Sequence, residues 1–123
     1  MNVALSMMDD AASRGVELLL LPELWSCGYD PETLVEDASR DAEPREGPRS
    51  QCLADAARRH NLFLAAGSVP ELGDDGQIHD TALVFDPHGV LRAWHRKAHL
   101  YRPTLEHTVF VPGDRLTMKP VPC

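Results

Sequence analysis

Four consecutive leucines, Leu18 to Leu21, constrain the fold of this 123-residue chain more than any other feature. They lie in a six-residue segment, 16–21, between Gly15 and Pro22. Such a segment is too short for a helix, and apolar side chains on both of its faces are typical of a strand that is covered on both sides. The segment therefore predicts a buried strand within a sheet.

Three segments carry helix signals. Apolar residues that recur every three or four positions predict a helix over 3–14. Pro31 suits a first helical position and predicts a short acidic helix that ends at Ser39. Ser50 is the expected N-cap of a longer helix that ends near His60. The first and third of these helices carry the apolar residues that a sheet needs as cover.

The remaining signals are those of strands, turns and a loop. Strand-like runs lie at 62–68, 80–85 and 90–96. Glycine-rich and Asp/Pro-rich turns over 73–76 and 86–89 separate them, and the second turn predicts a hairpin. A polar stretch that prolines interrupt, 40–48, is expected to be a surface loop. Helices and strands that alternate in this way predict a mixed α/β architecture of packed layers.

The composition excludes several classes of protein. With 43% hydrophobic and 25% charged residues, the chain is neither disordered nor collagen-like nor a disulfide scaffold. Its longest apolar run, Leu62 to Ala66, is far below the roughly 18 residues that a bilayer requires. Asp9 and Asp10 stand where a signal peptide would be apolar. We therefore expect a cytoplasmic protein with no membrane partner.

The net charge of −7 is unevenly distributed. Residues 1–46 hold eleven acids and three bases, whereas residues 89–119 hold six bases and two acids. The acidic balance of the whole chain argues against a nucleic-acid partner. The stretch from Arg92 to Arg102 still mixes basic residues with aromatic ones, so an anion or nucleic-acid site there is kept as an alternative. Such a site would lose affinity steeply as salt rises.

Two charged residues stand where α/β sheets bind ligands. Glu23 follows the leucine strand, and open α/β sheets bind ligands beyond the carboxyl ends of their strands. A carboxylate there is partly shielded from water, which suits a general base. Lys97 ends the last strand-like run, and a lysine beside such a carboxylate can stabilise a developing oxyanion. The structural alternatives are a turn-capping glutamate and a solvated basic strand edge.

His95 and His99 are four residues apart. Metal binding at that spacing needs a helix and a third ligand, whereas this stretch is predicted to be a strand that runs into a loop. We therefore expect no metal site there.

Six short motifs occur in one order over nearly the whole chain. They are Leu-Leu-Leu-Leu-Pro-Glu-Leu-Trp at 18–25, Gly28-Tyr29, Gly67-Ser-Val-Pro-Glu71, Asp80-Thr-Ala82, Arg96-Lys-Ala-His-Leu100 and Glu106-x-x-x-Phe110-x-Pro112-Gly-Asp114. In order and spacing they resemble the N-terminal half of the carbon-nitrogen hydrolase, or nitrilase, superfamily.

This resemblance implies a fold and an assembly. The fold is α/β, a partial α-β-β-α sandwich of the nitrilase type that is truncated at both ends. Residues 1–123 would form an incomplete domain without the first strand and the nucleophile-bearing half. The family is usually oligomeric, so a homo-oligomer is expected. No metal and no organic cofactor is implied.

The resemblance also implies a Glu-Lys-Cys mechanism on small amides, N-carbamoyl compounds or nitriles. Glu23 matches the general base of the family, and Lys97 matches the lysine that stabilises the tetrahedral intermediate. Glu106 matches a second glutamate, which orients the lysine or the substrate. Leu24 and Tyr29 are among the residues that could line a pocket or belong to the core, so they do not rank substrates.

The cysteine nucleophile of the family has no match in this sequence. In the family it follows the Pro-Gly-Asp motif on a further strand. Cys123 follows Pro-Val-Pro, which cannot form a central strand. Cys27 is expected to be a pocket or packing thiol, and Cys52 a packing residue. The chain is therefore expected to be nearly inactive, and the alternative is a catalytically inactive binding or interaction module derived from the same fold.

Overall fold

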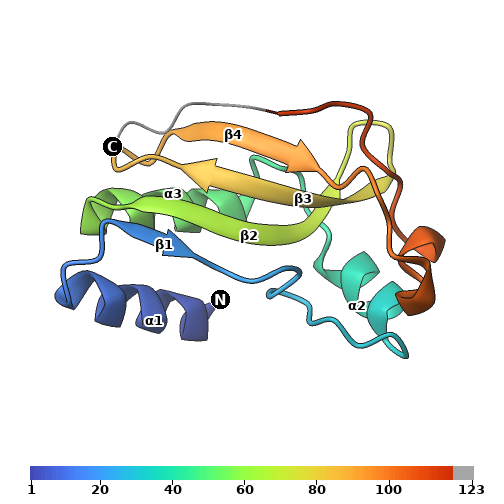
Figure 1. Cartoon of the computed structure of the whole chain (residues 1–123), viewed down its shortest axis with the longest axis horizontal. Helices are drawn as coiled ribbons and strands as arrows, with labels where there is room; N and C mark the ends of the chain where they lie inside the picture. The colour runs from blue at the N-terminus through green and yellow to red at the C-terminus, as the bar shows by residue number, and fades with distance from the viewer. Residues whose placement is uncertain (118–123) are drawn as a thin grey trace.

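A four-stranded sheet organises the structure, a computed structural model that describes residues 1–117 (Figure 1). Its strands lie in the order β1-β2-β3-β4. They are β1 (Leu18–Leu20), β2 (Phe63–Leu72), β3 (Ile78–Phe85) and β4 (Leu91–Arg96). β1 pairs with β2 in parallel, and the other neighbouring strands are antiparallel. This mixed sheet confirms the predicted α/β class.

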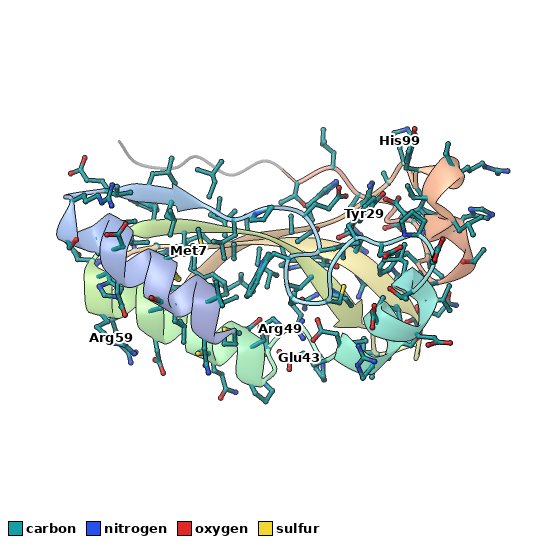
Figure 2. The ribbon with its side chains drawn as sticks, turned by 90° about the horizontal axis from the view of Figure 1, so that it is seen from below. Met7, Tyr29, Glu43, Arg49, Arg59 and His99 are labelled. Carbon is teal, nitrogen blue, oxygen red and sulfur yellow. The ribbon has the colours of Figure 1, made fainter. Side chains whose placement is uncertain are left out.

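Two long helices cover one face of the sheet. They are α1 (Asn2–Ser13) and α3 (Pro48–His60), which contact each other and lie side by side in Figure 2. The core between these helices and the sheet is formed by Met8, Leu53, Leu64, Ala66, Leu83, Phe85 and their neighbours. Phe63, Ala65, Ala82 and Val84, which alternate with these core residues along β2 and β3, are only partly buried. The chain thus contains one helix layer and one sheet layer of the predicted sandwich.

The leucine strand is shorter and more exposed than predicted. Only Leu18–Leu20 form β1, and this strand lies at the edge of the sheet. Leu19 packs against the core, whereas Leu18 and Leu20 are 53% and 66% exposed. The prediction of a strand covered on both sides is wrong for the part of the chain that the structure describes, because only one face of β1 is packed.

The short acidic helix begins later than predicted. α2 spans Leu34–Asp41, and Thr33 is its N-cap. Pro31 instead lies in a turn, where the Asp30 side chain accepts the Glu32 N–H at 2.9 Å. An aspartate that bonds to the backbone two residues further on stabilises a turn in competition with a helix, which explains the shift.

The longer helix begins earlier than predicted. α3 starts at Pro48, with Gly47 as its N-cap, so Ser50 lies within the first turn. Proline is favoured at a first helical position because its missing N–H has no helical partner to lose. The Ser50 hydroxyl donates to the Arg45 carbonyl instead of capping the helix. Residues 42–47 remain as the predicted loop.

Both predicted turns connect antiparallel strands. Residues 73–76 join β2 to β3, and residues 86–89 join β3 to β4. In the second turn the Asp86 carboxylate accepts the N–H groups of His88 and Val90, each at 2.9 Å. These bonds fix the hairpin that the Asp-Pro-His-Gly sequence predicts.

Candidate functional site

Glu23, Lys97 and Glu106 form one cluster. The Lys97 ammonium donates to Glu23 Oε1 at 2.7 Å and to Glu106 Oε1 at 2.8 Å. Glu23 follows β1, Lys97 follows β4, and Glu106 begins the short helix η2 (Glu106–Thr108). Figure 1 places these three segments at the same end of the sheet. The structure therefore brings together the three side chains that the sequence singles out.

Gly67 allows the Glu23 segment to approach the sheet. Gly67 lies in a β-bulge of β2 and has a φ of +59°. A Cβ atom at this position would lie 1.9 Å from the Pro22 carbonyl oxygen. That same oxygen accepts the Ser68 N–H at 3.3 Å. Only glycine permits this close approach, so the bulge determines where Glu23 is held.

The backbone of Lys97 is held from both sides. Its N–H donates to the Asp80 carbonyl at 2.8 Å, and its carbonyl accepts the Gly113 N–H at 2.9 Å. Lys97 therefore continues the pairing of β4 with β3 for one more residue. Two backbone bonds on a single residue limit the directions that its side chain can take.

Glu106 is a fully buried carboxylate with three donors. Its side chain is 0% exposed. It accepts bonds from the Lys97 ammonium, the Tyr29 hydroxyl and the Tyr101 N–H. Burial raises the pKa of Glu106, but the bonds from Lys97, Tyr29 and Tyr101 outweigh burial and hold this pKa below its usual range. Glu106 is thus the ionised partner of Lys97.

The other two members of the cluster differ from Glu106 in exposure. Desolvation lowers the pKa of Lys97, but its bonds to Glu106 and Glu23 outweigh that effect and leave the pKa raised. Lys97 is therefore a fixed positive charge. Glu23 is 47% exposed, so its shielding from water is incomplete. Glu23 is the carboxylate of the trio that solvent or a ligand can reach.

A cavity of about 520 Å³ opens beside the cluster. It is lined by Glu23, Gly67, Ser68, Asp80, Ala82, His95, Lys97, Ala98 and His99. Leu24 is buried in a second apolar cluster instead, and Tyr29 contacts Glu106 rather than the cavity. Among residues 1–117, no cysteine lines this cavity.

Two contributors to the site were not predicted. The sequence marks Tyr29 as part of a Gly-Tyr motif and as a possible pocket or core residue, but not as a partner of Glu106, to which its hydroxyl donates across 77 positions. Asp80 belongs to the Asp-Thr-Ala motif but was not predicted as a site residue. Burial raises the pKa of Asp80 to about 7, and Glu23 adds to the rise while Ser68 and Lys97 oppose it. No local pattern signals the contact of Tyr29, whereas an aspartate at the start of the strand-like run 80–85 is a signal that could have identified Asp80.

The cysteines within the described residues have packing environments. Cys27 packs against the cluster of Leu24, Leu34, Ala38 and Phe110. Burial and the nearby Asp41 raise the pKa of Cys27 to about 11, which disfavours the thiolate. Cys52 is a half-buried free thiol on α3. Cys123 lies outside the described residues.

The basic stretch that could bind anions is largely paired internally. Arg92 binds the Asp86 carboxylate at 2.6 Å, and Arg96 binds Glu71 at 2.8 Å. His95 lies on β4 and His99 in the following loop. Within residues 1–117, no group of three metal-binding side chains is arranged to hold an ion. In the same range, no helix is long and apolar enough to cross a membrane.

The mixed sheet and its helix layer define an α/β protein with a Glu-Lys-Glu cluster at one end of the sheet. The sequence profile of the carbon-nitrogen hydrolase family matches residues 1–122, so the chain belongs to that family. An omega-amidase of Xenopus laevis is 30% identical, over 99% of this chain and 45% of its own length.

Two solved structures resemble the fold. Nit3 of Saccharomyces cerevisiae, a nitrilase-superfamily member, superposes with a TM-score of 0.77 at 28% identity, over 93% of this chain and 42% of that one. A mutant amidase from Nesterenkonia sp. AN1 superposes with a TM-score of 0.66 at 32% identity, over 90% of this chain and 42% of its own. That amidase carries an acetamide moiety covalently added at its active site cysteine. This chain spans less than half the length of these relatives.

Proposed function

We propose that this chain carries the acid-base part of a site that hydrolyses non-peptide carbon-nitrogen bonds in small amides, N-carbamoyl compounds or nitriles. One observation carries the proposal: the Lys97 ammonium lies between two carboxylates, at 2.7 and 2.8 Å, beside an open cavity. Family membership supports the same reaction class.

Each residue has a distinct role in this proposal. Glu23, the exposed carboxylate, is the general base that takes a proton from the attacking thiol and later from water. Lys97 stabilises the negative oxygen of the tetrahedral intermediate. Glu106 is a positioning residue, because its bond to Lys97 fixes the ammonium while Tyr29 and Tyr101 hold Glu106 itself.

The reaction then proceeds in two steps for an amide. The thiolate forms a bond to the acyl carbon, the carbon-nitrogen bond breaks, and the leaving amine takes the proton from Glu23. Water, deprotonated by Glu23, then attacks the thioester and releases the acid and the thiol. Both steps pass through an oxyanion that lies within reach of Lys97.

The nucleophile in this proposal comes from polypeptide outside residues 1–123. Two observations support this part: no cysteine among residues 1–117 lines the cavity, and the relatives are more than twice as long as the matched region. The purified chain, assayed against simple amides, N-carbamoyl amines and nitriles, should show no turnover, because loss of a nucleophile costs on the order of a million-fold in rate. Turnover that Cys123→Ala abolishes would contradict this assignment.

The absence of a thiol at the cavity among residues 1–117 also favours a second function, a binding or interaction module without catalysis. The genomic sequence just downstream distinguishes the two. An in-frame strand with apolar-Cys-Tyr-Asp character supports the hydrolase, whereas a stop codon supports the module. If the frame continues, Lys97→Ala in the longer protein should lower kcat/KM by at least about a hundred-fold. Arg59→Ala, an exposed change on α3, is the control (Figure 2).

A further inference from the structure

Asp80 is a buried carboxyl group that the proposed reaction does not use. It lies on β3 and lines the same cavity as Glu23 and Lys97. Its side chain is only 1% exposed. Among the residues that the structure describes, its Oδ1 atom has no hydrogen-bond partner. A buried carboxylate oxygen without a donor is costly, because burial removes the water that would otherwise solvate it.

The charges around Asp80 explain why this oxygen has no donor. Its Oδ2 lies 4.0 Å from the Lys97 Nζ, but that ammonium already donates to Glu23 and Glu106 at shorter distances. Three carboxyl groups therefore share one ammonium. Glu106 is held ionised by its three donors, so an additional negative charge on Asp80 would face Glu23 without compensation.

The neighbouring strands supply little that could neutralise this charge. β2 contributes the Ser68 hydroxyl, and β4 contributes His95 at the cavity wall. Lys97, which follows β4, is the cation that faces Asp80. His99 is the remaining titratable residue that lines the cavity. Glu23 faces it from the segment after β1. A proton held between Asp80 and Glu23 turns two repelling carboxylates into a donor and an acceptor.

We propose that Asp80 is a further positioning residue of this site: its protonated carboxyl donates a hydrogen bond to the Glu23 carboxylate and holds that carboxylate against the Lys97 ammonium. This role rests on the proposed function, in which Glu23 is the general base. Burial and the nearness of Glu23 raise the pKa of Asp80 to about 7, so this group keeps its proton in mildly acidic solution, where an ordinary aspartate is ionised. Above that pH, Asp80 ionises and repels Glu23.

The test is a titration of the 123-residue chain with ¹³C-labelled carboxyl groups. Between pH 4 and pH 9, the Asp80 carboxyl carbon should titrate near pH 7 rather than near pH 4, where aspartates ordinarily titrate. The Glu23 carboxyl carbon should shift in the same step. Asp80→Asn keeps a neutral donor of the same shape that cannot ionise. The Glu23 carboxyl resonance should therefore show no change near pH 7 in this variant and should stay where it lies at low pH in the unsubstituted chain. Asp55→Asn, an exposed change on α3, is the control and should leave the step in place.

Asp80 titrating near pH 4 in the unsubstituted chain would overturn the proposal, and so would a neutral-pH step of Glu23 that persists in Asp80→Asn. A second measurement keeps the test valid if the variant is hard to refold. A folded-state pKa above the unfolded one means that folded Asp80 keeps a proton which the unfolded chain has lost, so stability should fall as pH rises from about 4 to about 7. A stability that does not fall over this window would contradict the proposal.

Neither measurement needs a substrate or a nucleophile. A lack of amide turnover would therefore not contradict the proposed hydrogen bond from Asp80 to Glu23. Conversely, an ordinary Asp80 titration removes this positioning role and leaves the proposed roles of Lys97 and Glu106 intact.

Discussion

Two buried glutamates in this chain, Glu71 and Glu106, are bound to cations, and they differ in the balance of charge around that contact. Glu71 is 3% exposed and accepts bonds from Arg45, Arg96 and the Thr81 hydroxyl. Arg45 also stacks over Trp94, 4.0 Å from the ring centroid. Two arginines therefore surround one carboxylate.

Glu106 is in the opposite situation. A single cation, Lys97, is shared with Glu23 and approached by Asp80, so acids outnumber the ammonium. Lys97 and Asp80 also line an open cavity. The comparison teaches that a buried ion pair does not by itself indicate a functional site. Arg45 and Arg96 line a cavity as well, so the feature that separates the two regions is the uncompensated negative charge beside Lys97.

The largest effect should come from removing the carboxylate of the arginine-rich pair. Glu71→Ala leaves Arg45 and Arg96 without their counter-ion in a partly buried environment. We expect the free energy of unfolding to fall by about 3–5 kcal/mol, as measured by urea denaturation. Glu46→Ala, an exposed change in the neighbouring loop, is the control. A loss below about 1 kcal/mol would mean that the two regions do not differ as described.

Removing the cation of the acid-rich cluster should have a smaller effect that depends on pH. Lys97→Met leaves Glu106 buried without its ammonium, at a cost of about 2 kcal/mol near pH 7. The folded pKa of Glu106 is lowered, so its stabilisation is present above the unfolded value of about 4.3 and is lost as pH falls through the folded pKa.

The difference in stability between the unsubstituted chain and Lys97→Met should therefore shrink between pH 7 and pH 3. Thermal or urea unfolding at several pH values measures this, with the exposed Arg58→Met as control. A difference that stays constant with pH would contradict the assignment of Glu106 as the ionised partner.

The smallest effects should come from the hydroxyl donors, one in each region. Tyr29→Phe removes a donor to Glu106, and Thr81→Val removes a donor to Glu71. Each change should cost about 1 kcal/mol of unfolding free energy. Tyr29→Phe should also raise the pKa of Glu106, which carboxyl NMR can follow, and Thr81→Val should leave Glu106 unchanged. Equal effects of Thr81→Val on both glutamates would show that the regions are coupled.

The sequence was sufficient for features that depend on local chemistry. The hairpin turns follow from Asp, Pro and Gly at fixed positions. Strand ends alone pointed only to Glu23 and Lys97, and the cluster with Glu106 was implied by the resemblance to the nitrilase superfamily. The apolar pattern alone predicted a strand covered on both sides, whereas the missing first strand that the family resemblance implies agrees with the exposure of Leu18 and Leu20 at the sheet edge.

Two other contacts between distant segments could not be predicted from the sequence. The donor from Tyr29 to Glu106 and the arginine pair on Glu71 each join distant segments, and nothing in their local sequence distinguishes them. The start of α2 at Leu34 depended on competition between a turn and a helix that differ little in free energy.

The bulge at Gly67 has a consequence for any attempt to redesign this cluster. The approach of the Glu23 segment to the sheet depends on an atom that is missing, the β-carbon of residue 67, because a Cβ atom there would lie 1.9 Å from the Pro22 carbonyl oxygen. No exchange of a neighbouring side chain could relieve that contact, because the oxygen belongs to the backbone. Gly67→Ala would add a methyl group that clashes with the Pro22 carbonyl oxygen, and this clash should move Glu23 away from Lys97.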